Sequence, residues 1–302
     1  MPYRLDDRRP LADELERLAR EQLDRALAAL AAPEADVQAR VHAARKRCKK
    51  VRALLRLVRP HLRGRDWRAL NVGLRDAARR VSEGRDAAVF PATYDRVRDR
   101  FGADFDRRGS APIRAALTRR AKARTAELHG EAALERLAGD LEAVHERLGE
   151  VRLRKTAAKA GAFDAVRPGL AATHDRARAA LDALGETPGP EAFHEWRKHV
   201  KYHRLQLGLL VSAWPAVVTA RHDEARRLGD LLGGAQDLAM LEAHLVAVPG
   251  GLGDPARVDV FLGLARRLRA ELEAEALPLG RRLFAERGAR VAKRLARWRA
   301  AG

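Results

Sequence analysis

The feature that most constrains the fold of this chain is a basic pattern that occurs twice, once in each half of its 302 residues. Segments 41–56 and 193–207 both contain H-x-x-R-K-x-x-K-x-x-R, and the matched residues are 152 positions apart. The matched residues are His42, Arg45, Lys46, Lys49 and Arg52 in the first segment, and His194, Arg197, Lys198, Lys201 and Arg204 in the second. A pattern that recurs after half of the chain predicts two related structural units.

Each segment has the periodicity of an amphipathic α-helix. Because a helix advances about 100° per residue, the five matched positions span only about 120° around the helix axis. The opposite side carries apolar residues, among them Cys48 and Val51 in the first segment and Trp196 and Val200 in the second. Each segment is therefore predicted to be a helix with one side in a core and one basic side.

Most basic helix sides are simply solvated, so three further features matter for a binding function. Lysine is scarce in the chain, yet most of it falls in these two segments. The lysines concerned are Lys46, Lys49, Lys50, Lys198 and Lys201. No carboxylate is expected on either basic side, and the histidine recurs together with the cations. Like charges at this spacing repel one another, so an anion bound among them would stabilise the helix.

The net charge of +19 indicates a polyanionic partner, which is a nucleic acid, an anionic membrane surface or a phosphate polymer. A hydrophobic content of 46% with 33% charged residues is typical of a globular protein. The single cysteine, Cys48, excludes a disulfide framework and fits a reducing cytoplasm. Because the first ten residues are polar and no long apolar run follows, we expect neither a signal peptide nor a membrane span.

Alanine, leucine, arginine and glutamate dominate, and no segment alternates with period two, so the fold class is predicted to be all-α. We expect one domain, 1–302, made of two pseudo-symmetric helical bundles of roughly four core helices each. Repeat 1 covers about 10–150 and repeat 2 about 151–300.

Several helix boundaries follow from capping and breaking residues. Asp66 is expected to cap a third helix, and Pro91 to bend or break a fourth. Pro112 is expected to open a long helical stretch. Near the C-terminus, separate helices are expected over 217–232 and 237–247.

These motifs resemble the CHAD, or conserved histidine α-helical domain, family. The resemblance is carried by the twin basic pattern, by N-x-x-L-R-D-A-A-R-R at 71–80 and by W-P…L-G-D-L-L-G…D-L-A-M-L at 214–241, and it covers roughly 11–298. It implies two four-helix bundles whose basic sides line a central channel that binds inorganic polyphosphate. It also implies association with polyphosphate granules. We expect a cytoplasmic protein without a cofactor or a bound metal.

Carried over by motif position, the resemblance implies that all ten matched residues contact phosphate. The secondary phosphate-binding candidates are Arg17, Arg20, Arg56, Arg176 and Arg178. The chain departs from the family pattern at 233–236, where Gly-Gly-Ala-Gln replaces the acidic, histidine-bearing turn expected before Asp237. Asp86 and Asp237 are interpreted as helix caps or as partners of a motif arginine.

Three alternatives remain open. Generic nucleic-acid binding uses the same electrostatics, although aromatic stacking platforms and helix-turn-helix or zinc-finger patterns are not evident. A phosphoryl-transfer enzyme could use His42 and His194, but the chain has neither a phosphate-binding loop of the Walker type nor an evident acidic magnesium-binding set. His199 and His203 have i,i+4 spacing suited to a metal, yet His203 occupies a core position and is expected to be buried and hydrogen-bonded. We therefore expect a binding protein rather than an enzyme.

Overall fold

The computed structural model describes residues 3–80, 82–102, 105–128, 130–154 and 161–302, with backbone alone at 82–88 and 125–128. Throughout these ranges the regular secondary structure is helical and no strand occurs, which confirms the predicted all-α class. Within the same ranges, no helix combines the length and the apolar character that crossing a membrane would require.

Four helices of the first half pack together around the first basic helix. Their bounds are α1 Leu11–Ala31, α2 Val37–Val58, α3 Gly64–Arg80 and α6 Glu131–Gly149. Helix α1 lies against α2 and α6, while α3 lies against α6 and α2. Asp36 starts α2, because its side chain accepts hydrogen bonds from the backbone N–H groups of Gln38 and Ala39. The predicted core side of α2, including Cys48 and Val51, is buried.

The second basic segment forms α10, which lies between α9 and α11. The helices of the second half are α8 Ala162–Ala165, α9 Arg167–Asp182, α10 Pro190–Leu209, α11 Pro215–Ala247, α12 Pro255–Leu283 and α13 Gly288–Ala301. Two short 3-10 turns, η1 Arg59–His61 and η2 Val211–Ala213, follow α2 and α10 respectively. The matching turns place both basic helices in a similar local context.

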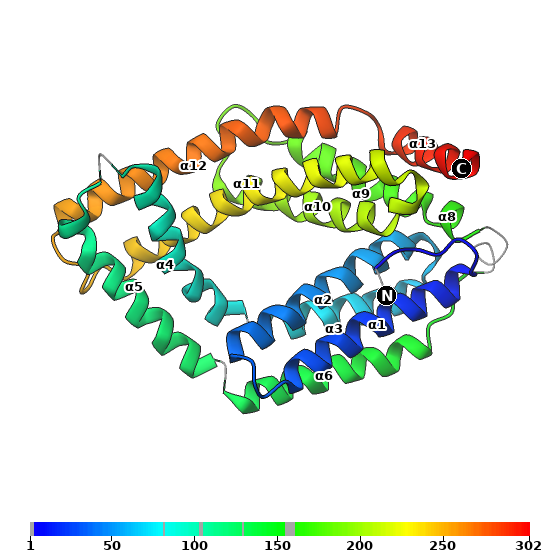
Figure 1. Ribbon diagram of the computed structural model, residues 1–302, viewed down its shortest axis with the longest axis horizontal. Coiled ribbons are helices and arrows are strands. Elements are labelled where there is room, and N and C mark those ends of the chain that lie inside the picture. The colour runs from blue at the N-terminus through cyan, green and yellow to red at the C-terminus, as the bar shows by residue number, and fades with distance from the viewer. Residues whose placement is uncertain (1–2, 81, 103–104, 129, 155–160) are drawn as a thin grey trace.

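A separate hydrophobic cluster holds the part of the molecule farthest from the C-terminus (Figure 1). Helices α4 Ser82–Arg100 and α5 Arg107–Leu128 pack there against the C-terminal part of α11 and the first part of α12. The main cluster contains the remaining helices of both halves. The boundary between the two hydrophobic clusters therefore does not coincide with the boundary between the two repeats, and the duplication stays a prediction.

Several predicted helix boundaries are wrong. Helix α11 runs without a break where a turn was expected, because Gly234 is buried where α11 meets other helices: a Cβ there would lie 3.0 Å from Leu272 of α12. Helix α4 does not break at Pro91, which lies inside it, and Pro112 lies inside α5 rather than at its start. Asp66 lies within the first turn of α3 and is not its cap. Packing along these long helices outweighs the local breaking signals.

Candidate anion-binding site

The basic side of α2 lies along α3, which partly covers it. His42 and Lys46 are exposed, Lys49 and Arg52 are half-buried, and Arg45 is only 9% exposed. Arg45 Nη1 donates a hydrogen bond to the carbonyl oxygen of Ala78 (2.7 Å), and Arg52 Nε donates to Asn71 Oδ1 (3.3 Å). Helix α3 therefore fixes two guanidinium groups of the motif in place.

The basic side of α10 lies along α11 in a comparable way. His194 Nδ1 donates to Oε1 of Gln236 (2.9 Å), and Arg197 lies beside Gly233, where an added Cβ would be 3.6 Å from the guanidinium. Residues 233–236 are thus a helical surface that accommodates the motif, not a loop. Asp237 lies inside α11 and cannot cap it, and the side chain of Asp86 is outside the described residues.

We call the five motif residues of α2 the first basic stripe and those of α10 the second. One carboxylate does lie next to the second basic stripe, contrary to expectation. Glu195 forms an ion pair with Lys198 and accepts a hydrogen bond from His199 Nε2 (3.1 Å). The hydrogen bond to Lys198 holds the pKa of Glu195 below its usual value. Glu195 is about 100° around the helix from His194, so it lies beside the stripe and not within it. From there its carboxylate reaches Lys198.

The two basic helices meet near their C-terminal ends. Gln206 Nε2 donates to the carbonyl oxygen of Ala53 (3.2 Å), and the Tyr202 ring lies between the helices. The Arg56 guanidinium carbon is 4.2 Å from the centre of that ring and the Arg52 carbon is 5.8 Å from it. Figure 1 shows α2 and α10 approaching each other in this direction. The tertiary structure therefore brings the ends of the two stripes together.

Burial of cations is the main electrostatic feature of the site. Burial lowers the pKa of Arg52, and repulsion from Arg56 and Arg75 lowers it further. Burial likewise lowers the pKa of Arg204, against an opposing attraction from Asp230. Removing a cation from water near other cations is unfavourable, so a bound anion would relieve this cost.

Of the secondary candidates, Arg56 and Arg176 lie near the basic stripes, whereas Arg17 and Arg20 are bonded to other side chains. Burial lowers the pKa of Arg176, and repulsion from Arg59 and Arg56 lowers it further, so Arg56 and Arg176 lie near each other. Arg17 donates to the buried Glu14 (2.7 Å), and Arg20 contacts Glu16 and His145. Arg17 is therefore bonded within α1, and Arg20 is bonded both within α1 and to His145 of α6.

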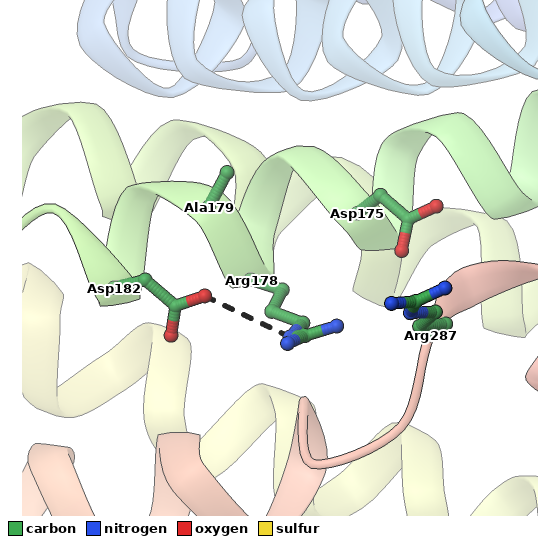
Figure 2. Close-up of a pocket in the computed structure, with 5 residues that line it drawn as sticks. All are labelled: Asp175, Arg178, Ala179, Asp182 and Arg287. Carbon is green, nitrogen blue, oxygen red and sulfur yellow. Dashed lines mark ion pairs between the residues drawn. The ribbon is translucent and has the colours of Figure 1, made fainter.

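Arg178 also lies apart from the basic stripes. It forms an ion pair with Asp182 (3.7 Å) beside a polar pocket of about 320 Å³, which Asp175, Ala179 and Arg287 also line (Figure 2). Arg176 and Arg178 are two residues apart on α9 and therefore point to different sides of that helix. The structure does not join Arg178 to the motif residues.

The histidine pair at 199 and 203 is split between surface and core. His203 is fully buried, as predicted, but the predicted hydrogen bond is wrong, because neither ring nitrogen has a partner among the described residues. Its ring lies 4.9 Å from that of His174 and 5.5 Å from that of Phe284. In the described part of the chain, no group of three or more His, Cys, Asp and Glu side chains is placed to hold a metal ion.

Sequence reasoning missed several residues of this surface. Asn71, Gln236 and Tyr202 contact motif residues, while Trp67 and Arg59 lie at the end of the first stripe. Asn71 is the first residue of the N-x-x-L-R-D-A-A-R-R motif at 71–80, so the sequence did mark it as a family position. The others carry no spacing signal, because their neighbours in space come from other helices.

Together these features define an all-helical protein with cationic side chains gathered on two helices that share a sequence motif. A family model described as CHAD domain matches residues 7–246, and the chain belongs to this family. The solved structure of PptA from Streptomyces chartreusis is similar in fold, with a TM-score of 0.63 at 19% identity. The match covers 92% of this chain and 100% of that chain. A search of curated proteins finds no match.

Proposed function

We propose that this protein binds inorganic polyphosphate along the basic sides of α2 and α10. The observation that carries the proposal is that two copies of one cationic motif, far apart in sequence, end at a common contact around Tyr202. Membership of the CHAD family supports the same ligand, through the resemblance described above. In this proposal the two stripes line one channel, and the ten motif residues contact phosphate.

The chemistry of the motif suits a flexible phosphate chain. Such a chain carries a negative charge at every unit, and each stripe extends over about three helical turns, or roughly 15 Å. Arginine can bind phosphate oxygens with two parallel hydrogen bonds, while lysine acts as a compact charge. Arg45 and Arg52 are held by Ala78 and Asn71, so these arginines lose less conformational freedom on binding.

Binding rather than catalysis fits the arrangement around the histidines. His194 is hydrogen-bonded to an amide oxygen of Gln236, and His42 is exposed at the start of its stripe. We propose that both assist anion binding. Through its ligand the protein would be recruited to polyphosphate granules in the cytoplasm. Nucleic acid is the competing partner, because the net charge of +19 would attract any polyanion.

The test reverses one lysine in each stripe. In K49E/K201E, two attractive contacts become repulsive, and we expect polyphosphate affinity to fall by at least about 100-fold. Isothermal titration calorimetry at about 150 mM salt measures this with long-chain polyphosphate and, in parallel, with duplex DNA at equal phosphate concentration. Circular dichroism should show unchanged helicity, since both side chains lie on basic sides.

The matched control is K122E/K293E, which makes the same charge change at exposed lysines of α5 and α13. It should bind polyphosphate nearly as tightly as the wild type. If both double variants lose affinity equally, binding depends on net charge alone. Equal wild-type affinities for DNA and polyphosphate, both lost as salt rises, would favour the nucleic-acid alternative.

A further inference from the structure

Three arginines and two aromatic rings from five different elements gather where the two basic helices meet. We call this set the arginine–aromatic cluster; it consists of Arg56 of α2, Arg59 of η1, Trp67 of α3, Arg176 of α9 and Tyr202 of α10. The Arg56 guanidinium carbon lies 4.2 Å from the centre of the Tyr202 ring and 5.5 Å from that of Trp67. The Arg59 guanidinium carbon lies 4.9 Å from the centre of the Trp67 ring.

The cluster is cationic and poorly neutralised by the protein. No ion pair within the described residues joins Arg56, Arg59 or Arg176 to a carboxylate, and Arg56 Nε is buried without a hydrogen-bond partner there. His199 is a neighbour of this cluster: burial lowers its pKa, and repulsion from Arg56 and Arg176 lowers that pKa further. Its partner Glu195 is also bonded to Lys198. Helix α9, which carries Arg176, packs against α2 and η1, and Arg59 and Arg56 lie close enough to Arg176 to lower its pKa. The three guanidinium groups therefore lie near one another.

The form of this cluster differs from that of the stripes. Each stripe is a row of cations along one helix, suited to successive units of a chain. The cluster instead brings cations from three elements toward one region, and two of the guanidinium carbons lie 4.2 and 4.9 Å from the centres of aromatic rings. An aromatic ring attracts a guanidinium group without neutralising its charge, so the group can still bind an anion.

We propose that the arginine–aromatic cluster is a subsite for the terminal phosphate group of a phosphate chain. This proposal rests on the proposed function. An internal phosphate of the polymer carries one negative charge, whereas a terminal one carries nearly two near neutral pH, as phosphate monoesters do. Three converging arginines match the terminal group better than an internal unit, because both charge and the number of free oxygens are greater.

The subsite also gives the bound chain a fixed register. With one end held at the junction of α2 and α10, successive internal units would extend along the motif residues toward the N-terminal ends of both helices. The protein would then recognise ends of polymers as well as their length. A chain without a free terminal phosphate would still bind the stripes, but more weakly.

The experiment compares long-chain polyphosphate with the same polymer after each terminal phosphate has been coupled to an uncharged amine. The resulting phosphoramidate, which we call the blocked polymer, lacks one ionisable oxygen of the terminal group. Calorimetry at about 150 mM salt should show the wild type binding the blocked polymer about tenfold more weakly, the equivalent of one charge-assisted contact. In R59Q/R176Q this preference should disappear, because affinity for the free-ended polymer should fall about tenfold further than affinity for the blocked polymer. Both arginines are exposed, so the variant should fold.

The control variant is R147Q/R167Q, which removes two arginines bonded to Glu150 (3.4 Å) and Asp164 (3.2 Å). Arg167 is nine residues before Arg176 on α9 and points to the opposite side of that helix. This control should keep the preference for free ends. A wild type that binds both polymers equally, or an R59Q/R176Q variant that loses affinity for both equally, overturns the subsite. A wild type that binds neither polymer overturns the proposed function itself.

Discussion

Arg17 and Arg204 are the same residue type on helices of the main core, yet their pKa values move in opposite directions. The hydrogen bond to Glu14 raises the pKa of Arg17, whereas burial lowers that of Arg204. Arg17 already has a carboxylate, so an incoming phosphate would have to displace it. Burial of the charged Arg204 guanidinium is unfavourable, and a bound anion would reduce that free-energy cost. At the scale of single residues, the partner of each arginine therefore separates structural cations from candidate binding cations.

If the proposed function holds, His194 should make polyphosphate binding depend on pH. Its pKa is lowered, first by burial and further by Arg197 and Lys198, with the hydrogen bond to Gln236 acting in the opposite direction. A bound polyanion favours the protonated ring, so the pKa rises on binding. The complex then holds more protons than the free protein, and affinity should increase as the pH falls from neutral to below 6.5.

Calorimetric titrations between pH 8 and pH 5.5 measure this effect, with H194Q as the reference. Glutamine keeps a hydrogen-bonding side chain but cannot titrate, so the comparison subtracts the protonation of the ligand itself. The wild type should gain several-fold more affinity than H194Q on acidification. Parallel pH profiles for the two proteins would exclude a role for this proton.

At the scale of elements, the position of α2 depends on a close approach by α9. A Cβ at Gly169 would lie 1.8 Å from the carbonyl oxygen of Leu57, so no larger residue fits without moving one helix. G169A should therefore destabilise the protein by about 3 kcal/mol or more, measured by urea unfolding. Because α2 and α9 carry Arg56 and Arg176, polyphosphate affinity should fall as well.

G139A is the matched substitution, since Gly139 lies on α6 and a Cβ added there would meet no atom within 4 Å. Alanine has the higher helix propensity, so this variant should gain about 0.5 to 1 kcal/mol. Equal unfolding free energies for G169A and the wild type would contradict the close approach of the two helices.

For the whole molecule, the buried histidines predict a loss of stability in acid. Burial lowers the pKa of His174 to about 4, against a hydrogen bond from its Nε2 to the carbonyl oxygen of Glu286, and lowers that of His203 well below 6.5. Arg221 contributes in the same direction. Between pH 6.5 and about 4, the unfolded chain binds more protons than the folded one, so stability falls as the pH falls.

From this pKa, His174 alone should contribute about 3 kcal/mol of the loss by pH 4. Thermal unfolding at several pH values between 7 and 4 measures it. H203L should be more stable than the wild type, because His203 has no hydrogen-bond partner within the described residues, and should lose less stability in acid. A wild-type melting temperature that does not change over this range would refute the prediction.

The sequence was sufficient for the fold class and for the positions of the two basic helices. Local composition and a repeated period of 3.6 residues carry that information, because a helix places its core side and its basic side within one segment. The same motif supported the family, which the family model confirms over residues 7–246. The apolar sides of α2 and α10 are buried as the pattern predicted.

Long-range packing decided the rest. Gly234 looked like part of a turn, but it allows close packing around α11, and a single sequence does not show which helix will lie against a glycine. The rings of Tyr202 and Trp67 meet Arg56 from two other helices, Arg59 lies against the same Trp67 ring, and no spacing rule predicts such contacts. Charge and periodicity are local properties of a chain, whereas the partner of each cation depends on how whole helices pack.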